Sequence, residues 1–191
     1  MPRAAPFAFL APFALVVAAC ATAPSVPPTA AVSPRDEPFA IDGRLSARRG
    51  GEGVSIVFAW MHASPRDDLL VSTPLGQAVA ELSSDASIPR VEVRTADGRR
   101  EESSDWAALT ERIFGFPLPV AELAWWAQGA PRADAPHSLE TDAAGRASVL
   151  RQDGCEIVYA YADGSTLRPS RLTLVCHDLE LRIVIDRWRA A

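Results

Sequence analysis

The sequence predicts an α+β domain that is mostly antiparallel β-sheet, and three observations support this. Apolar and polar residues alternate with a period of two in both halves of the chain, as in strands with one buried face. Turn residues such as Asp97-Gly98 separate these segments at hairpin spacing. Two segments between residues 105 and 128 follow helical spacing instead. Strands, two helices and strands again predict a strongly curved sheet with the helices over one face or mouth.

The first half of this domain is predicted to be a meander of antiparallel strands. A strand with inward positions up to Ala47 ends at a loop of three glycines, Gly50, Gly51 and Gly53. A second strand follows, and residues 62–66 form the next turn. A hairpin over residues 67–82 and a strand over residues 89–95 complete this half. The inward positions of the first two strands are Ile41, Gly43, Leu45, Ala47, Val54, Ile56, Phe58 and Trp60.

The middle of the chain is predicted to be helical. Residues 105–114 and 120–128 have apolar side chains at helical spacing, and each segment is followed by a glycine. Ser103 or Ser104 supplies the cap of the first helix. Residues 130–142 show neither period, and we expect an irregular loop there. Each helix brings a tryptophan to its apolar stripe, Trp106 in the first and Trp126 in the second.

The last third returns to the period of two. In the final segment, Leu179, Leu181, Ile183 and Ile185 alternate with polar or charged neighbours and with Val184, which predicts a strand with one buried face. The four strands expected here cover residues 147–152, 156–161, 171–175 and 179–187.

A turn in the first half carries an apolar residue at its tip. Pro74 has the φ value of the first corner of a β-turn, and Gly76 supplies the conformational freedom needed next to it. Leu75 lies between them, although turn tips are normally polar. Either Leu75 folds back onto the body of the domain, or it contacts a membrane or an acyl chain.

The N-terminal segment has the pattern of a lipoprotein signal. Residues 1–19 contain Arg3 and a short apolar run that ends in Val-Ala-Ala before Cys20, so we expect cleavage there and acylation of Cys20. Residues 20–38 are rich in Pro, Ala, Ser and Thr, which predicts an extended tether. The residue after the cysteine is Ala21 rather than aspartate, which favours the outer membrane, facing the periplasm. The alternative is an ordinary secretory signal with a chance cysteine.

Composition excludes several classes of function. Removal of residues 1–19 takes the formal net charge from −5 to −6, and an acidic chain without a basic stripe argues against nucleic acid as a partner. His62, His137 and His177 lack the spacing of a metal site, and no glycine-rich phosphate loop is present. Cys155 lacks a nucleophile signature. We therefore expect neither an enzyme nor a bound cofactor.

Seven motifs in order give the domain a family resemblance. They are FAIDGRLS at residues 39–46, FAW at 58–60, TPLG at 73–76, ADGR at 96–99, GFPLP at 115–119, LRQDG at 150–154 and LRIVIDRW at 181–188. These motifs follow the lipoprotein signal that ends at Cys20, and together with it they resemble the LolB family of outer-membrane lipoprotein receptors. The resemblance implies an incomplete β-barrel with helices as a lid over an apolar cavity. It also implies a receptor that takes triacylated lipoproteins from the periplasmic carrier LolA and releases them into the inner leaflet of the outer membrane. We expect the protein to be a monomer. Cys155 departs from the pattern, because an aromatic residue is usual there.

The resemblance also gives roles to particular residues. The Pro74-Leu75-Gly76 loop corresponds to a family loop whose exposed apolar residue assists delivery into the membrane. The alternative for the predicted cavity is a filled core, and the corresponding rival function is a structural or assembly lipoprotein with a surface for a protein partner. The residues expected to line the cavity are Leu45, Val54, Ile56, Phe58, Trp60, Trp106, Trp126, Ile183 and Ile185.

Two cysteines of the last third are candidates for a disulfide. In the simplest antiparallel register Tyr161 faces Ser170, and counting outward places Cys155 opposite Cys176. Directly opposed residues in a non-hydrogen-bonded pair lie within reach of a disulfide, and the periplasm is oxidising. A slip of one residue would put the two cysteines on opposite faces, and the alternative is two free thiols.

Overall fold

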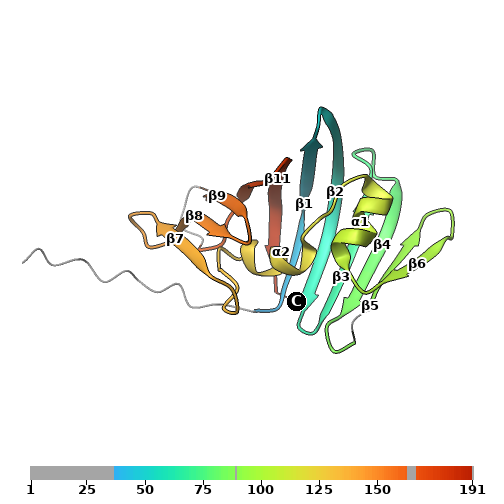
Figure 1. Cartoon of the computed structure of the whole chain (residues 1–191), viewed down its shortest axis with the longest axis horizontal. Helices are drawn as coiled ribbons and strands as arrows, with labels where there is room; N and C mark the ends of the chain where they lie inside the picture. The colour runs from blue at the N-terminus through green and yellow to red at the C-terminus, as the bar shows by residue number, and fades with distance from the viewer. Residues whose placement is uncertain (1–36, 89, 163–166, 191) are drawn as a thin grey trace, which may run out of the picture.

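The computed structural model describes residues 37–88, 90–162 and 167–190. The predicted signal peptide, Cys20 and nearly all of the predicted tether lie outside these residues. Within them, one antiparallel sheet of 11 strands runs in the order β6-β5-β4-β3-β2-β1-β11-β10-β9-β8-β7 (Figure 1). The edge strands β6 and β7 do not pair with each other, so the sheet curls without closing into a barrel. The mostly antiparallel, unclosed fold class is therefore confirmed.

The strands and helices have the following bounds. The first half contains β1 (Phe39–Arg49), β2 (Glu52–Ala63), β3 (Arg66–Ser72), β4 (Ala78–Asp85), β5 (Arg90–Thr95) and β6 (Arg100–Ser103). The helices are α1 (Trp106–Phe114) and α2 (Val120–Trp126). The last third contains β7 (His137–Thr141), β8 (Ala147–Gln152), β9 (Cys155–Ala160), β10 (Arg171–Cys176) and β11 (Leu179–Arg189). None of the helices among the described residues is long and apolar enough to cross a bilayer.

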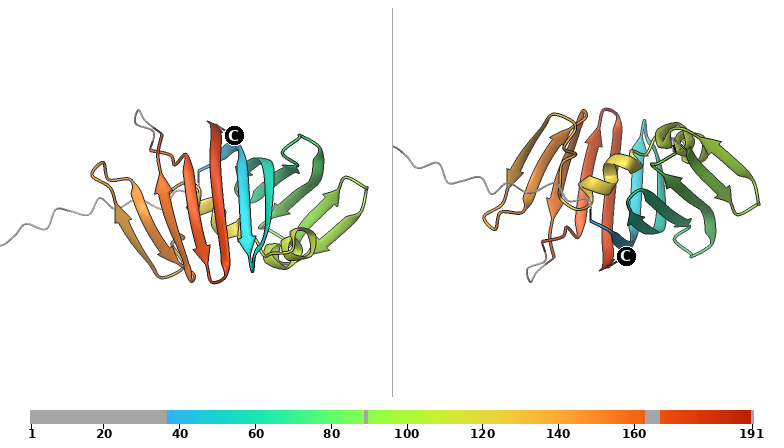
Figure 2. Two further views of the ribbon diagram at one scale, coloured as in Figure 1. Left: turned by 90° about the horizontal axis from the view of Figure 1, so that it is seen from above. Right: turned by 90° about the horizontal axis from the view of Figure 1, so that it is seen from below.

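The sheet is curved, its concave face carries most of the buried apolar residues, and both helices lie on that side (Figures 1 and 2). Alternate residues of β1, β2 and β11 are buried, as the period of two predicts, because each strand turns one set of side chains inward. Helix α2 lies across β11 and β1, whereas α1 contacts β5 and β6. The hydrophobic core is therefore formed between one face of the sheet and the helices.

The two edge strands correct the prediction. Residues 130–142 are not entirely irregular, because residues 137–141 form β7, which pairs with β8. Strand β6 pairs with β5 but has the sequence Arg-Glu-Glu-Ser, which has no apolar position. Strand β7 has a single aliphatic residue, Leu139. Edge strands of this kind bury little on either face, so they leave no alternation in the sequence.

Several boundaries also differ from the prediction. The cap of α1 is Asp105, whose carboxylate accepts from the Ala107 N–H at 2.9 Å, and neither serine at 103 or 104 takes this role. His62 is buried inside β2 rather than placed in a turn, and Gly53 also belongs to that strand. Helix α2 ends two residues earlier than expected, and turns continue to Gly129 at φ 75°.

The predicted register of the last hairpin is confirmed. Strands β9 and β10 pair so that Cys155 lies opposite Cys176, and the structure joins their sulfurs in a disulfide. The Cα atoms of the pair lie 4.2 Å apart. This bond fixes β9 against β10 at the end of the hairpin that is remote from its loop.

Candidate functional site

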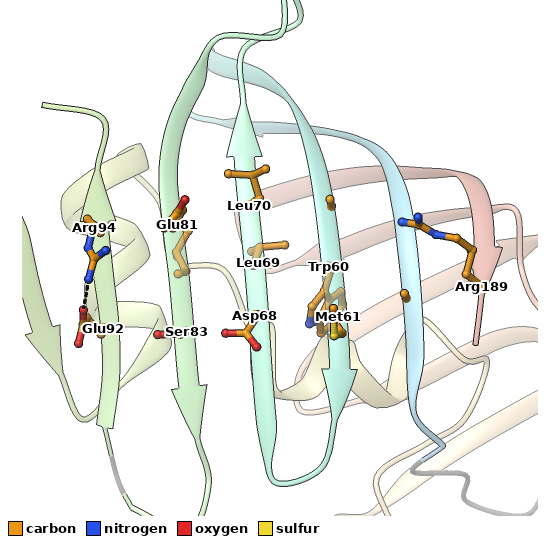
Figure 3. A pocket seen from close by; sticks show the side chains of 13 residues that line it. Trp60, Met61, Asp68, Leu69, Leu70, Glu81, Ser83, Glu92, Arg94 and Arg189 are labelled. Atoms are coloured by element: carbon orange, nitrogen blue, oxygen red, sulfur yellow. Dashed lines mark ion pairs between the residues drawn. The ribbon is translucent and has the colours of Figure 1, made fainter. Parts of the chain in front are cut away.

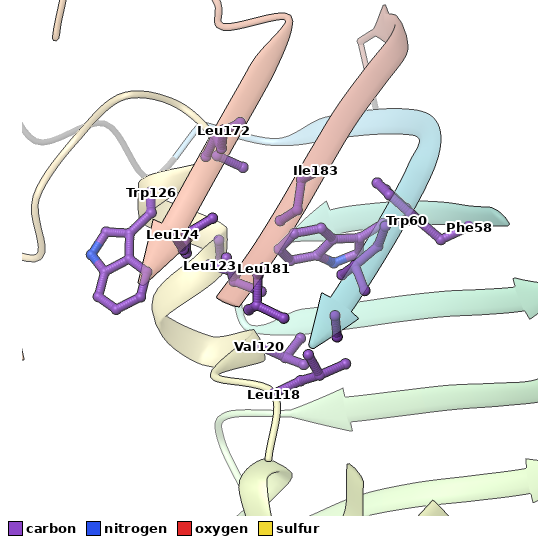
Figure 4. Packing of buried hydrophobic residues seen from close by; sticks show 14 of the residues in the cluster. Phe58, Trp60, Leu118, Val120, Leu123, Trp126, Leu172, Leu174, Leu181 and Ile183 are labelled. Carbon is purple, nitrogen blue, oxygen red and sulfur yellow. The ribbon is translucent and has the colours of Figure 1, made fainter. Parts of the chain in front are cut away.

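A small apolar cavity lies between the concave face of the sheet and α2 (Figure 4). Its volume is about 40 Å³, and every side chain around it is apolar. Its lining residues are Ile41, Leu45, Ile56, Phe58, Trp60, Leu69, Val71, Leu118, Val120, Leu123, Ala127 and Ile183. The sheet therefore supplies the floor and walls, and α2 with the connector before it supplies the roof.

The structure brings five of the nine predicted lining residues to this cavity. They are Leu45, Ile56, Phe58, Trp60 and Ile183. Val54 and Ile185 share the same strand faces but lie outside the lining, because the cavity extends along only part of each strand. The two helix tryptophans do not line it either.

The positions of the helix tryptophans have a physical cause. Trp126 is fully buried, but its indole N–H donates to the Gln152 Oε1 at 3.0 Å, so the ring turns toward β8 and away from the cavity. Trp106 belongs to α1, which packs near β5 and β6 at the other side of the concave face. A buried indole needs an acceptor for its N–H, and Gln152 offers one. Neither of these two predicted lining residues therefore contributes to this cavity.

Sequence reasoning missed seven residues that line the cavity. Ile41, Leu69 and Val71 continue the inward faces of β1 and β3, and the period of two already marked Ile41 as inward. The remaining four form the roof, and Leu123 lay on the apolar stripe of the predicted helix. They are Leu118, Val120, Leu123 and Ala127.

In this conformation the cavity is almost filled. A volume of about 40 Å³ holds roughly one water molecule, whose share of the liquid is about 30 Å³. The concave face therefore has the packing of a filled core while α2 lies on it. Space for a long chain requires α2 and its connector to move outward.

Few polar contacts hold the roof in place. The backbone N–H of Leu118 donates to the Thr110 Oγ1 at 2.7 Å, which ties the connector to α1. The Trp126–Gln152 bond ties the end of α2 to β8. The Arg132 guanidinium also donates to the Glu122 carboxylate of α2 at 2.9 Å. Apolar contacts supply the rest, because Val120 and Leu123 are buried against the sheet. Apolar contacts have no directional requirement, so another apolar group can replace them.

One wall of the cavity is fixed by a buried carboxylate. The Trp60 indole N–H donates to the Asp67 Oδ1 at 2.8 Å, and the His62 Nδ1 lies 2.8 Å from the same oxygen. Phe39 packs against both rings, with centroid distances of 5.1 Å to Trp60 and 5.0 Å to His62. Because Asp67 is buried, removing it would leave an indole donor unsatisfied in a dry environment. Asp67 therefore fixes the orientation of the Trp60 ring.

The turn between β3 and β4 presents its apolar residue to solvent. The Gly76 N–H donates to the Thr73 carbonyl and the Thr73 N–H donates to the Gln77 carbonyl, each at 2.8 Å. Gly76 has φ 83°, a value that favours glycine. The side chain of Leu75 is 91% exposed, so it does not fold back onto the domain. The prediction of an apolar residue at a turn tip is confirmed, and the turn is held by its own backbone bonds.

A larger groove of about 390 Å³ lies on the outer face of β2 to β5 (Figure 3). Met61 and Leu70 are exposed in it, but charged side chains surround them. The charged residues are Asp68, Glu81, Glu92, Arg94 and Arg189. An acyl chain in this groove would displace water from those charges, which is costly. The cavity under α2 is therefore the better candidate for an apolar ligand.

Comparison with known proteins agrees with this geometry. A sequence model of the family described as "Outer membrane lipoprotein LolB" matches residues 37–188. The chain is 33% identical over 178 residues to the outer-membrane lipoprotein LolB of Chromobacterium violaceum, covering 92% of this chain and 94% of that protein. It is 36% identical over 186 residues to the LolB of Azoarcus sp., covering 94% and 95%.

The fold has a counterpart among solved structures. A LolA superfamily protein, NE2245 from Nitrosomonas europaea, superposes with a TM-score of 0.51 at 6% sequence identity. The match covers 82% of this chain and 87% of that protein, and at this identity it supports the fold alone. The family match spans nearly the whole described domain, including the cavity, α2 and the Leu75 turn. The chain therefore belongs to the LolB family of outer membrane lipoproteins.

Proposed function

We propose that this protein is a receptor anchored in the outer membrane by acylated Cys20, facing the periplasm. In this proposal it accepts triacylated lipoproteins from the carrier LolA and inserts them into the inner leaflet of the outer membrane. The observation that carries the proposal is the apolar cavity, whose roof is a separate short helix resting on apolar contacts. Family membership supports the same role.

The size of the cavity defines how a client would enter. Each acyl CH₂ removed from water gains about 0.8 kcal/mol, so a chain of about fifteen carbons gains roughly 12 kcal/mol. The present volume of about 40 Å³ accepts none of that chain. Entry therefore requires the chain to replace Leu118, Val120 and Leu123 on the concave face. Because these contacts are apolar on both sides, the exchange needs no nucleotide and no catalytic residue.

Release would use the Leu75 turn. A leucine that is 91% exposed on a turn with its own backbone bonds is able to enter a bilayer without unfolding the domain. Val71, near the end of β3 that leads into this turn, lines the cavity. Insertion of the turn would therefore bring the cavity close to the acyl region of the membrane. A client then passes from the concave face into the bilayer without crossing water.

Anchoring and binding belong to different parts of the chain in this proposal. Cys20 carries the lipid, and the Pro- and Ala-rich residues that follow it separate the lipid from the domain that begins at β1. Cys20→Ala is therefore expected to abolish the anchor and to preserve acyl-chain binding. If the unlipidated protein fails to take a client from its carrier, the lipid is part of the binding site and this division of roles is wrong.

The deciding experiment separates this proposal from its rival. A fluorescent fatty-acid probe is titrated into the Cys20→Ala protein, and the transfer of a lipoprotein from LolA to vesicles is measured in parallel. We expect saturable uptake of the probe and transfer that depends on the protein. A structural or assembly lipoprotein with a filled core would show neither, so the absence of saturable uptake would favour that function.

A further inference from the structure

One polar group on the concave face has no hydrogen-bond partner among the described residues. The side chain of Tyr159 in β9 is 7% exposed, and its hydroxyl makes no hydrogen bond to any residue that the structure describes. Buried polar groups are almost always hydrogen-bonded, and an unsatisfied one destabilises the folded state. Phenylalanine would fill the same volume without this penalty. A ligand that supplies a hydrogen-bond acceptor to this hydroxyl would remove the penalty.

The position of Tyr159 connects it with the apolar cavity. In the sheet register, Tyr159 lies opposite Leu172, and Leu172 lies opposite Ile183. The same row continues through Leu45 to Ile56. All five residues are buried, and the last three line the cavity. Four strand spacings of about 4.8 Å make this row roughly 19 Å long, which is comparable with an extended palmitoyl chain.

The segment that roofs the cavity also reaches the strands beside Tyr159. Leu123 and Ala127 line the cavity, and Trp126 is bonded to β8, the neighbour of β9. Gly129, just after α2, lies so close to the Tyr161 hydroxyl that a Cβ there would be 3.5 Å from it. Outward movement of α2 would therefore uncover the row of apolar residues as one trough, with the tyrosine at one end.

The chemistry of the hydroxyl selects the kind of ligand group that it binds. Burial raises the pKa of Tyr159 well above its ordinary value, so the hydroxyl stays protonated and acts as a donor at neutral pH. An acyl chain of a lipoprotein ends in an ester or amide carbonyl, which accepts hydrogen bonds. We infer that the Tyr159 hydroxyl donates to the carbonyl oxygen at the head of a bound acyl chain, while the chain lies along the row toward Ile56. This inference rests on the proposed function.

The chain contains a matched control for this inference. Tyr161 follows β9, and its hydroxyl donates to the Ala147 carbonyl oxygen at 2.8 Å. These two are the only tyrosines of the sequence. Tyr161→Phe removes a hydroxyl that already has a partner, whereas Tyr159→Phe removes one that has none. The two variants therefore lose the same atom, which has a described partner in Tyr161 and none in Tyr159.

The test compares two ligands that differ at the carbonyl. Methyl palmitate and hexadecyl methyl ether each compete with a fluorescent fatty-acid probe for the mature chain carrying Cys20→Ala. We expect the wild-type domain to bind the ester about three- to tenfold more tightly than the ether, the range of one hydrogen bond. Tyr159→Phe should reduce this ratio to about one and leave the affinity for the ether unchanged. Tyr161→Phe should keep the wild-type ratio.

Thermal melting without ligand gives an independent measurement. Tyr159→Phe should melt at or above the wild-type temperature, and Tyr161→Phe should melt below it. A drop in Tyr159→Phe as large as that of Tyr161→Phe means that the hydroxyl has a partner in the free protein, such as a bound water, and overturns the inference. Equal affinities of the wild type for ester and ether also overturn it. If neither ligand displaces the probe from the wild type, the proposed function itself fails.

Discussion

Leu75→Glu is expected to impair delivery while leaving the stability of the domain almost unchanged. The Leu75 side chain is 91% exposed, so it contributes little packing, and its replacement should change the free energy of unfolding by less than about 0.5 kcal/mol. In a bilayer the same side chain gains about 1.5–3 kcal/mol by leaving water. Losing that gain lowers the inserted population of the turn about 10- to 150-fold. A carboxylate also opposes insertion, so the loss should reach at least this range.

The assay follows a lipoprotein from the loaded protein into vesicles. Ile88→Glu is the matched control, because Ile88 is 53% exposed on the turn at the opposite end of β4. We expect Leu75→Glu to bind the client normally, melt at the wild-type temperature and deliver the client at least tenfold more slowly. Ile88→Glu should melt and deliver like the wild type.

Three outcomes would refute this reasoning. Delivery by Leu75→Glu at the wild-type rate would show that the turn has no role in insertion. A large fall in its melting temperature would show that Leu75 supports the fold despite its exposure. Equal impairment in Ile88→Glu would show that any added negative charge slows delivery, whatever its position.

Three further predictions concern stability. Replacing Cys155 and Cys176 by serine removes a cross-link that spans 21 residues, so the free energy of unfolding should fall by about 3 kcal/mol. Urea titration measures this change. Alkylation of both thiols in the unreduced native protein would show that the bond is absent. Asp67→Ala leaves a buried indole N–H without its acceptor and should lower the free energy of unfolding by about 1–3 kcal/mol. Asp68→Ala, on the exposed face of the same strand, should leave it almost unchanged. Equal melting temperatures for the two variants would contradict the role of the buried carboxylate. Gly43→Ala places a Cβ 2.3 Å from a backbone carbonyl of β11, so it should destabilise by about 1–3 kcal/mol or more. A wild-type melting curve would mean that the backbone at the register shift between Asp42 and Gly43, in the pairing of β1 with β11, relaxes freely.

Much of the fold was predictable because most strands bury one face. The period of two located the inward residues of β1, β2 and β11, and a hairpin count located the register of β9 and β10. Those signals come from local chemistry, so they are visible in one sequence. Strands β6 and β7 gave no such signal, since an edge strand with few apolar side chains looks like a loop.

The site was less predictable because its geometry depends on contacts between distant segments. Trp126 has the sequence environment of a residue that faces the cavity, yet Gln152, 26 residues away, takes its N–H and turns the ring toward β8. Asp67 is one of two consecutive aspartates, and the sequence does not reveal which of them is buried. Tyr159 has the pattern of an ordinary inward residue of β9. Only the absence of a partner within the described structure distinguishes it.

A cavity and a filled core share one sequence pattern, because each needs the same apolar face of the sheet. When no chain is bound, the roof lies on this face and fills the space. The same packing affects how readily a bound chain is released. A bound chain must keep Leu118, Val120 and Leu123 off the sheet, and exposing three such side chains costs about 4.5–9 kcal/mol in total. A bilayer gives the chain its full gain of roughly 12 kcal/mol for fifteen carbons without this cost. Binding to the protein is therefore weaker than binding to the membrane by about the free energy of closing the roof. Under the proposed function, the packing of α2 would thus make transfer to the membrane downhill, with no input of chemical energy.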